Sequence, residues 1–380
     1  MAAEKRSIFE EVAPGRPPEP PRPASRARKT GARNSVRNWL IALFVLVVLM
    51  IVVGGLTRLT GSGLSITEWR PVTGAIPPLS QAAWLAEFDR YREIPQYDLV
   101  NRGMTLAEFK VIYWWEWGHR QLGRTLGLVW AIGFLWFWLS GRMPPGWTGR
   151  LLLLGALGGV QGAIGWWMVA SGLGEGMIAV ASYRLAIHLG LAFVILGLIA
   201  WYVQLLGRTS PELMVARRSR ERGLFGLGTG LMHLGFVQIL LGALVAGIDA
   251  GRGYTDWPLM HGVFFPPEAL DLEPLWRNFF ENAAMTQFVH RIGGYLLLLL
   301  GLIAWLAGRR SVHRATRRAF GAMMLVLLAQ VGLGIATVMQ GAPWYLAIAH
   351  QLVAVLLWVT ILRARFLAQY PRAESIRGRA

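Results

Sequence analysis

The sequence contains no cysteine in its 380 residues. This excludes disulfides, thiolate nucleophiles and metal sites built on sulfur. Acidic residues are also scarce, with 21 Asp and Glu against 38 Lys and Arg. Histidine is rare as well, with seven copies, but without cysteine it is the natural ligand for a buried metal. These absences direct the search for a functional site to a few histidines.

Apolar residues make up 54% of the sequence, although its formal net charge is +17. These two properties conflict in a soluble globular protein but agree in a membrane protein with basic cytoplasmic segments. The 18 Trp and 45 Gly support this interpretation, because Trp favours the membrane–water interface and Gly is frequent in membrane helices. The basic residues cluster between apolar spans, so we expect no nucleic acid partner.

Eight segments are apolar and long enough to cross a bilayer, whose hydrocarbon core of about 30 Å requires about 20 helical residues. They lie at approximately residues 38–57, 115–139, 149–170, 182–206, 223–247, 285–307, 319–340 and 344–367. The sequence therefore predicts an all-α integral membrane protein with eight transmembrane helices.

The segments between the spans differ in their density of Lys and Arg. These residues are concentrated in both tails and in the short segments on the same side, and are sparser in two long loops, 58–112 and 249–284. The positive-inside rule then places both termini in the cytoplasm and both long loops outside. Glutamates near the N-terminus argue against a mitochondrial transit peptide. We expect a multi-pass protein of the bacterial inner (plasma) membrane rather than the mitochondrial inner membrane.

The first four spans resemble the last four. Gly63–Trp69, after the first span, has its counterpart in Gly251–Trp257, after the fifth. His119-Arg120 in the second span likewise matches His290-Arg291 in the sixth. Because four helices return the chain to its starting side, both copies have the same orientation and are related by an axis along the membrane normal. The repeat predicts two pseudo-symmetric four-helix bundles.

The repeat and the charge pattern together divide the chain into five parts. Residues 14–23 are rich in proline and cannot form a helix, which predicts disorder at the N-terminus. The expected parts are a disordered basic cytoplasmic tail at 1–37, an N-terminal bundle at 38–206, a basic cytoplasmic linker at 207–222, a C-terminal bundle at 223–367 and a cytoplasmic tail at 368–380.

Four of the seven histidines fall at matching depth in the even-numbered spans. They are His119, His188, His290 and His350. Ionisable residues inside a membrane are costly and tend to be functional. Two imidazoles on facing helices suit the iron of a haem, whereas structural zinc takes four clustered ligands, often including cysteine. We predict two haem sites, one formed by His119 with His188 and the other by His290 with His350.

The two copies differ at one chemical position. Glu116 lies three residues before His119, whereas Gln287 lies three residues before His290. Residues three apart share a helix face, so Glu116 is expected to face the same cavity as His119. A carboxylate there can accept or relay a proton, which glutamine cannot. The N-terminal site is therefore predicted to perform chemistry while the other carries electrons. The alternative is a hydrated Glu116 at the membrane interface.

Arg120 and Arg291 each follow a histidine directly. Arginine binds carboxylates in a bidentate fork, which makes both residues candidates for contact with haem propionates. Adjacent residues on a helix point about 100° apart, so neither arginine can face the iron together with its histidine. A contact with the neighbouring loop is the structural alternative.

With these residues the chain resembles the haem A synthase family of cytochrome oxidase maturation. The resemblance covers roughly residues 36–367 and rests on Gly54–Arg58, the Glu-x-x-His-Arg element at 116–120 and the other three histidines. It implies oxidation of the C8 methyl group of haem O to the formyl group of haem A, with Glu116 required. Some bacterial members carry a cysteine pair in the first outer loop. This sequence lacks it, so the electron route stays open.

The resemblance also implies which half plays which role. His119 and His188 would bracket the substrate haem, and His290 and His350 would ligate a resident haem b. Haem O, membrane lipid, haem O synthase and cytochrome oxidase assembly factors are the expected partners, the electron donor is not identified, and a homo-oligomer is the expected assembly. Two other functions fit the histidine pairs: a di-haem cytochrome exchanging electrons with quinol, and a haem chaperone or transporter.

Overall fold

The computed structural model describes residues 23–372 except residue 175. Within these residues eight helices are long and apolar enough to cross a membrane, and no strand forms. They are α1 (Pro23–Leu59), α4 (Leu106–Leu139), α5 (Thr148–Gly172), α6 (Ser182–Leu206), α8 (Arg222–Gly247), α10 (Ala283–Gly308), α11 (Arg314–Met339) and α12 (Trp344–Gln369). The predicted all-α membrane fold is confirmed, and the protein is a multi-pass membrane protein.

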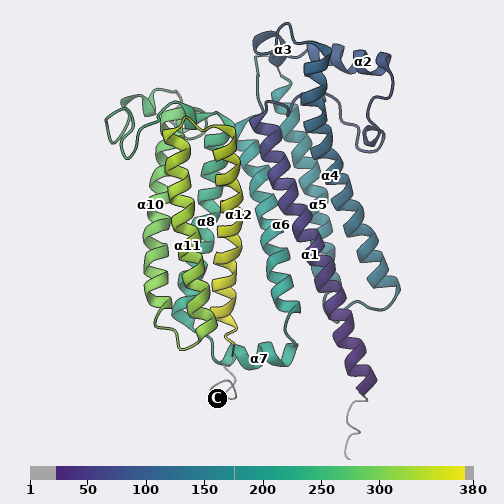
Figure 1. Ribbon diagram of the computed structural model, residues 1–380, viewed down its shortest axis with the longest axis vertical. Helices are drawn as coiled ribbons and strands as arrows, with labels where there is room; N and C mark the ends of the chain where they lie inside the picture. The colour runs from purple at the N-terminus through teal and green to yellow at the C-terminus, as the bar shows by residue number, and fades with distance from the viewer. Residues whose placement is uncertain (1–22, 175, 373–380) are drawn as a thin grey trace, which may run out of the picture.

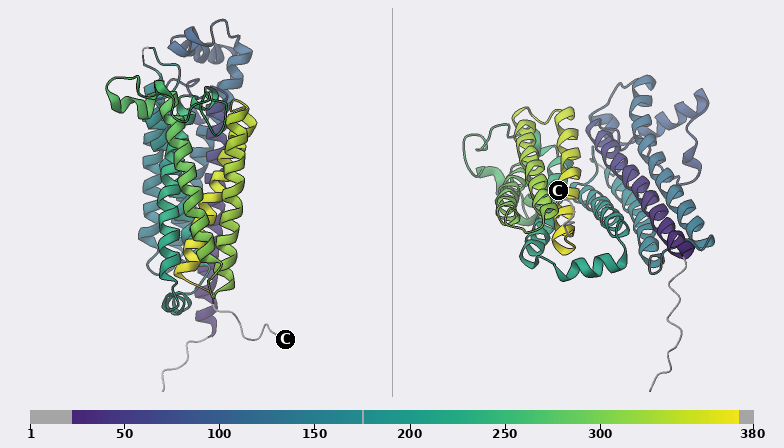
Figure 2. Two further views of the ribbon diagram at one scale, coloured as in Figure 1. Left: turned by 90° about the vertical axis from the view of Figure 1, so that its left-hand side faces the viewer. Right: turned by 60° about the horizontal axis from the view of Figure 1, so that its bottom comes forward.

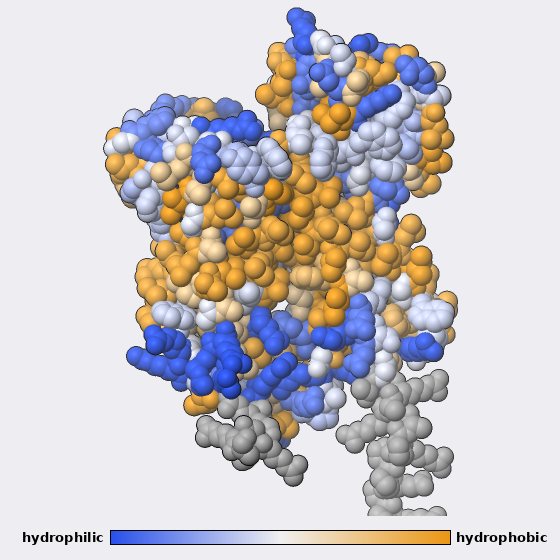
Figure 3. Space-filling model, viewed as in Figure 1, coloured by the Kyte–Doolittle hydropathy of each residue, from blue (hydrophilic) through white to orange (hydrophobic). Residues whose placement is uncertain are grey.

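The long helices form two groups. Helices α1, α4, α5 and α6 pack together, as do α8, α10, α11 and α12, and α6 packs against α8 where the groups meet (Figures 1 and 2). Helices α1 and α12 also touch across this boundary. On the face that Figure 3 shows, an apolar belt crosses the middle of the molecule, and polar residues gather toward both ends. A belt of this kind is what a lipid bilayer requires of its protein surface.

Both long loops lie at the same end of the molecule, which we call the loop end (Figure 1). They contain short helices that the sequence did not predict. In the first loop these are η1 (Thr73–Ala75), α2 (Gln81–Arg92) and α3 (Pro95–Leu99). In the second they are η2 (Ala250–Arg252), η3 (Pro267–Leu270), η4 (Leu275–Arg277) and α9 (Asn278–Glu281). The linker at the opposite end contains α7 (Ser210–Arg218).

Two helices begin earlier than expected. Helix α4 begins at Leu106 rather than at residue 115, because Thr105 and Glu108 form a reciprocal capping box at its N-terminus. Helix α1 begins at Pro23 rather than at residue 38, and proline is well suited to a first helical position. The tail expected at 1–37 is therefore helical from residue 23, and its residues 1–22 lie outside the described part. Residues 373–380 of the expected C-terminal tail lie outside it as well.

Helices α4 and α5 approach closely because a tryptophan ring covers a glycine. The Trp130 indole donates a hydrogen bond to the carbonyl of Leu151 (3.1 Å), and a Cβ placed on Gly155 would lie 2.0 Å from the Trp130 ring. We expect Gly155→Ala to destabilise the protein by about 1–3 kcal/mol through overpacking. The check is a lowered Tm of the detergent-solubilised protein. Gly158→Ala on the same helix is the control, because no atom lies within 4 Å of its Cβ position. Equal Tm values for the two variants would contradict the packing argument.

Candidate haem sites

Each of the four membrane histidines packs against a glycine on a neighbouring helix, which we call its facing glycine. A Cβ on that glycine would lie about 3 Å from the histidine Cε1, so a side chain there would displace the ring. The pairs are Gly54 with His119 (2.8 Å), Gly165 with His188 (3.0 Å), Gly242 with His290 (3.1 Å) and Gly334 with His350 (2.9 Å). The four histidines thus occupy two pairs of equivalent positions in the repeat, all toward the loop end.

The structure brings the histidines together in the predicted combinations. His119 and His188 are close enough to interact electrostatically, and so are His290 and His350. All four residues are half-buried rather than sealed in the core. The described residues contain no group of three or more His, Asp or Glu that could hold a metal ion. Each site therefore offers two imidazoles, the number of axial ligands that a haem iron takes.

Glutamines from neighbouring helices bond three of the four rings. Gln161 Nε2 lies 3.2 Å from Nδ1 of His188, and Gln238 Nε2 lies 3.1 Å from Nδ1 of His290. Gln330 Nε2 lies 3.2 Å from Nε2 of His350. The exception is His119, whose Nδ1 is buried without a hydrogen-bond partner in the described part of the chain. The sequence did not predict these contacts, because they depend on which helix faces meet.

The Glu116 carboxylate is 3% exposed and is held by four hydrogen bonds. One oxygen accepts from the Ser65 hydroxyl and the Ile66 amide, both at 2.8 Å. The other accepts from the Arg120 guanidinium, through Nε at 3.1 Å and through a terminal nitrogen at 2.6 Å. Its described contacts thus lead to the first long loop, and no described hydrogen bond joins it to His119. The sequence predicted that Glu116 faces the cavity of His119, but it did not predict these hydrogen bonds to the loop.

At the equivalent position in the C-terminal half, the side chain is an amide instead of a carboxylate. The Gln287 side chain is 3% exposed and donates to the carbonyl of Tyr254 (3.1 Å). Arg291 donates to the same carbonyl (3.0 Å) and to that of Leu259 (2.8 Å). Arg291 has no ion-pair partner among the described residues, and its Nε is buried without a hydrogen-bond partner. This half therefore has no direct ion pair at the position where the other half pairs Glu116 with Arg120, and the carboxylate that acts on Arg291 electrostatically is the more distant Asp256 of the second loop.

Both arginines of the His-Arg elements hold the long loops in place. Arg120 donates to the carbonyls of Ile66 (2.7 Å) and Glu68 (3.1 Å), as Arg291 does to the second loop. The loop contact that the sequence left as an alternative is therefore present in both halves. A contact with a haem propionate stays a prediction for both residues.

Two side chains connect the halves close to the histidines. Arg58, at the end of α1, donates to the carbonyl of Ala246 (2.6 Å) and to the carboxylate of Asp249 (2.9 Å). Gln351, next to His350, donates to the carbonyl of Ile51 on α1 (2.7 Å). The two histidine pairs are thus held in a fixed relation across the boundary between the bundles.

The remaining histidines lie apart from the pairs. His233 is exposed on α8. His261 lies in a turn of the second long loop, where its ring lies against Tyr254 and its backbone amide donates to the Asp256 carboxylate (2.8 Å). His313 precedes α11 at the end opposite the loop end.

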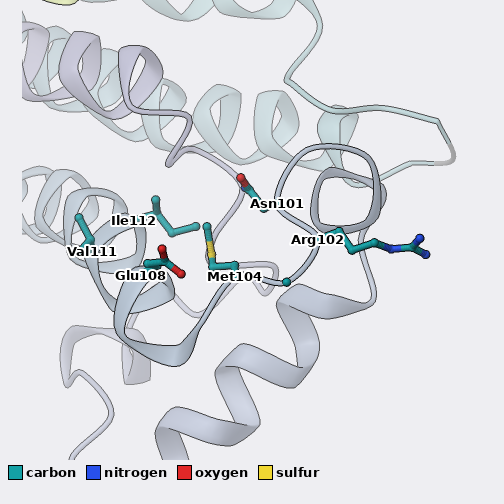
Figure 4. A pocket seen from close by; sticks show the side chains of 7 residues that line it. Asn101, Arg102, Met104, Glu108, Val111 and Ile112 are labelled. Atoms are coloured by element: carbon teal, nitrogen blue, oxygen red, sulfur yellow. The ribbon is translucent and has the colours of Figure 1, made fainter.

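A hollow at the loop end lies next to the first turns of α4 (Figure 4). Its lining comes from the segment after α3 and from the start of α4: Asn101, Arg102, Gly103, Met104, Glu108, Val111 and Ile112. None of the four membrane histidines lines it. The candidate site therefore remains the pair of histidines in each bundle.

The donor set fits haem. The facing glycines let each ring pack directly against a neighbouring helix, and Nδ1 of both His119 and His350 is a buried nitrogen without a partner in the described part of the chain. The unpartnered Nε of Arg291 lies one residue beyond a candidate iron ligand, where an anionic substituent of a macrocycle could accept its hydrogen bond.

Comparison with known proteins gives one matching family and many similar sequences. The family is described as cytochrome oxidase assembly protein, and its model matches residues 37–362. The chain is 65% identical over 377 residues to the heme A synthase of Ruegeria pomeroyi, covering 98% of this chain and 99% of that protein. It is 63% identical over 379 residues to the heme A synthase of Dinoroseobacter shibae, with 99% of each covered.

Proposed function

The chain belongs to the cytochrome oxidase assembly family, whose similar members are heme A synthases, and from this premise we propose that its two histidine pairs have different roles in one reaction. The protein is an oxidoreductase that converts haem O to haem A. The observation that supports unequal roles is the Glu116–Arg120 ion pair, which the second site replaces with Gln287 and Arg291.

We assign the substrate haem to His119 and His188 in the N-terminal bundle. The only ionisable carboxylate at the two equivalent positions lies here, and conversion of a methyl group to a formyl group breaks two of its C–H bonds. Glu116 is held at its position by the loop and by Arg120, so it acts as an oriented proton acceptor. The C8 methyl group is the predicted position of reaction.

We assign a resident haem b to His290 and His350 in the C-terminal bundle. The Arg291 guanidinium has no direct ion pair and its Nε has no hydrogen-bond partner in the described part of the chain, which favours binding of a group with anionic propionates. When bound there, haem b supplies one-electron transfer. Gln351 and Arg58 hold this site at a fixed position relative to the substrate site, which suits passage of electrons between them.

The membrane arrangement follows from the same assignment. We propose that the protein lies in the bacterial inner (plasma) membrane with both termini in the cytoplasm and the loop end outside. The apolar belt gives haem O access from lipid (Figure 3). Haem O synthase and cytochrome oxidase assembly factors would deliver the substrate and receive the product, and a homo-oligomer is the proposed assembly.

A single experiment tests the proposal against its alternatives. The chain is expressed in a host that makes haem O but no haem A, and the extracted haems are separated by chromatography. We expect haem A with the wild-type chain and none with His119→Ala. A di-haem cytochrome or a haem chaperone would bind haem b without producing haem A. Absence of haem A under all conditions, with haem b still bound, would therefore reject the proposal.

A further inference from the structure

The two long loops carry a repeated motif that the proposed reaction does not use. Residues 74–78 of the first loop and 262–267 of the second are apolar, and each run begins with glycine and ends in two prolines. Their central side chains project from the fold, since Ile76 is 67% exposed and Phe264 is 65% exposed. Leu79, directly after the first motif, is 83% exposed. Clustered apolar surface of this kind marks an interaction site.

The first motif lies beside α4 near the level of a candidate iron ligand. Arg124 follows His119 by five residues on α4 and donates to the carbonyls of Arg70 (3.0 Å) and Pro71 (2.8 Å). A Cβ on Gly74 would lie 3.0 Å from the same guanidinium. Side chains on a helix slant toward its N-terminus, so this guanidinium reaches back toward the level of His119. The segment before α2 therefore hangs beside α4 (Figure 1).

The second motif lies at the same level of its own bundle. Phe264 lines a small cavity together with Ile292 and Tyr295 of α10. Tyr295 follows His290 by five residues, which is the place that Arg124 has in the first half. The two motifs thus occupy equivalent positions in space as well as in the sequence repeat.

This level coincides with the edge of a bilayer core. Helix α4 has 34 residues, whereas a hydrocarbon core of about 30 Å takes only about 20. The end of α4 opposite the loop end carries the exposed Trp136 and Trp138, which are typical of a membrane interface. About 20 residues counted back from these tryptophans reach His119. The first turns of α4 therefore rise beyond the hydrocarbon, and both motifs lie at its surface.

The backbone of the first motif is suited to contact with lipid, where every polar backbone group needs a partner. Pro77 and Pro78 have no N–H group. The other three amides of 74–78 bond carbonyls of the same segment: Gly74 to Arg70 (3.2 Å), Ala75 to Val72 (3.1 Å) and Ile76 to Thr73 (3.3 Å). No amide of this motif is therefore left for a protein partner, whose interface would require hydrogen bonds as well as apolar contact.

We propose that both motifs insert into the lipid interface at the loop end, with Ile76, Leu79 and Phe264 in contact with acyl chains. They extend the apolar surface of the spans, and they flank the two bundles at equivalent places. In the first loop, insertion fixes the far side of the segment whose start bonds Glu116 through Ile66. The inference does not depend on which bundle binds the substrate haem.

The test uses the absence of cysteine, which allows a single nitroxide label at a chosen position. Ile76→Cys is labelled in phosphatidylcholine nanodiscs, and its collisions with oxygen and with a water-soluble nickel chelate are measured by electron paramagnetic resonance. We expect high oxygen access and loss of nickel access, as for Leu128→Cys on the lipid-facing side of α4. Leu99→Cys is the matched control, since it is equally exposed but lies in α3 at the tip of the same loop, where nickel should reach it (Figure 1).

The neighbouring label Leu79→Cys keeps the test open if Ile76→Cys does not fold, and Phe264→Cys tests the second motif. Nickel access at Ile76 or Leu79 equal to that at Leu99 would overturn insertion of the first loop, and the same result at Phe264 would overturn insertion of the second. Labels that are open to nickel in nanodiscs but shielded in native membranes would show that a protein covers the motifs, which also overturns the proposal.

Discussion

Glu116→Gln is expected to abolish haem A production while leaving the fold and the bound haem b intact. Loss of a positioned proton acceptor typically lowers a rate by about 10²–10⁴-fold, which is below detection in a haem extract. The measurement is chromatography of haems from cells that supply haem O, beside the absorption spectrum of the purified variant. The structure makes glutamine the informative replacement, because Gln287 shows that an amide fits the equivalent position and bonds its loop.

Three further variants separate chemistry from loop anchoring. Ser65→Ala removes one of the four donors to the carboxylate and should lower haem A production only partly. Glu116→Ala leaves the Arg120 guanidinium without its ion-pair partner and should disturb the loop as well as the reaction. Gln287→Glu places a carboxylate in the other half and should not produce a second reaction site. Normal haem A production by Glu116→Gln would show that Glu116 only anchors the loop.

The membrane architecture was predictable because it depends on local composition. Each span is a continuous run of apolar residues, and its centre is visible without knowledge of any contact. The true start of α4 was missed since its first residues extend beyond the apolar run. Thr105 and Glu108 do carry the signature of a helix N-terminus, so a search for capping boxes would have found it.

The histidines were predictable because the repeat places them at equivalent positions along the chain. Their surroundings were not, because these depend on which helix faces meet. Gln351 contacts Ile51 across 300 positions of sequence, and no local pattern marks that pair. The loop contacts of Glu116 were hidden for the same reason. The contacts of Gln161, Gln238 and Gln330 with the histidine rings were hidden as well, since each joins two different helices.

His350→Ala is expected to remove the low-spin spectrum of the resident haem b. A haem iron held by two imidazoles is six-coordinate, and loss of one ligand leaves an open position and a weaker site. His350 comes from α12, where its ring lies against Gly334 and is bonded by Gln330 (3.2 Å). No other histidine of the described residues lies at this site except His290. The absorption and electron paramagnetic resonance spectra of the purified protein provide the measurement.

The matched control is His188→Ala at the equivalent position of the other bundle. It removes the same side chain from the same place in the repeat, so its cost in packing is comparable. It should leave the resident haem b spectrum unchanged and prevent haem A production. Gly334→Ala adds a graded test, since its Cβ would lie 2.9 Å from the His350 ring and should alter the spectrum without removing the ligand. If instead His188→Ala removes the haem b signal and His350→Ala preserves it, the roles of the two bundles are exchanged.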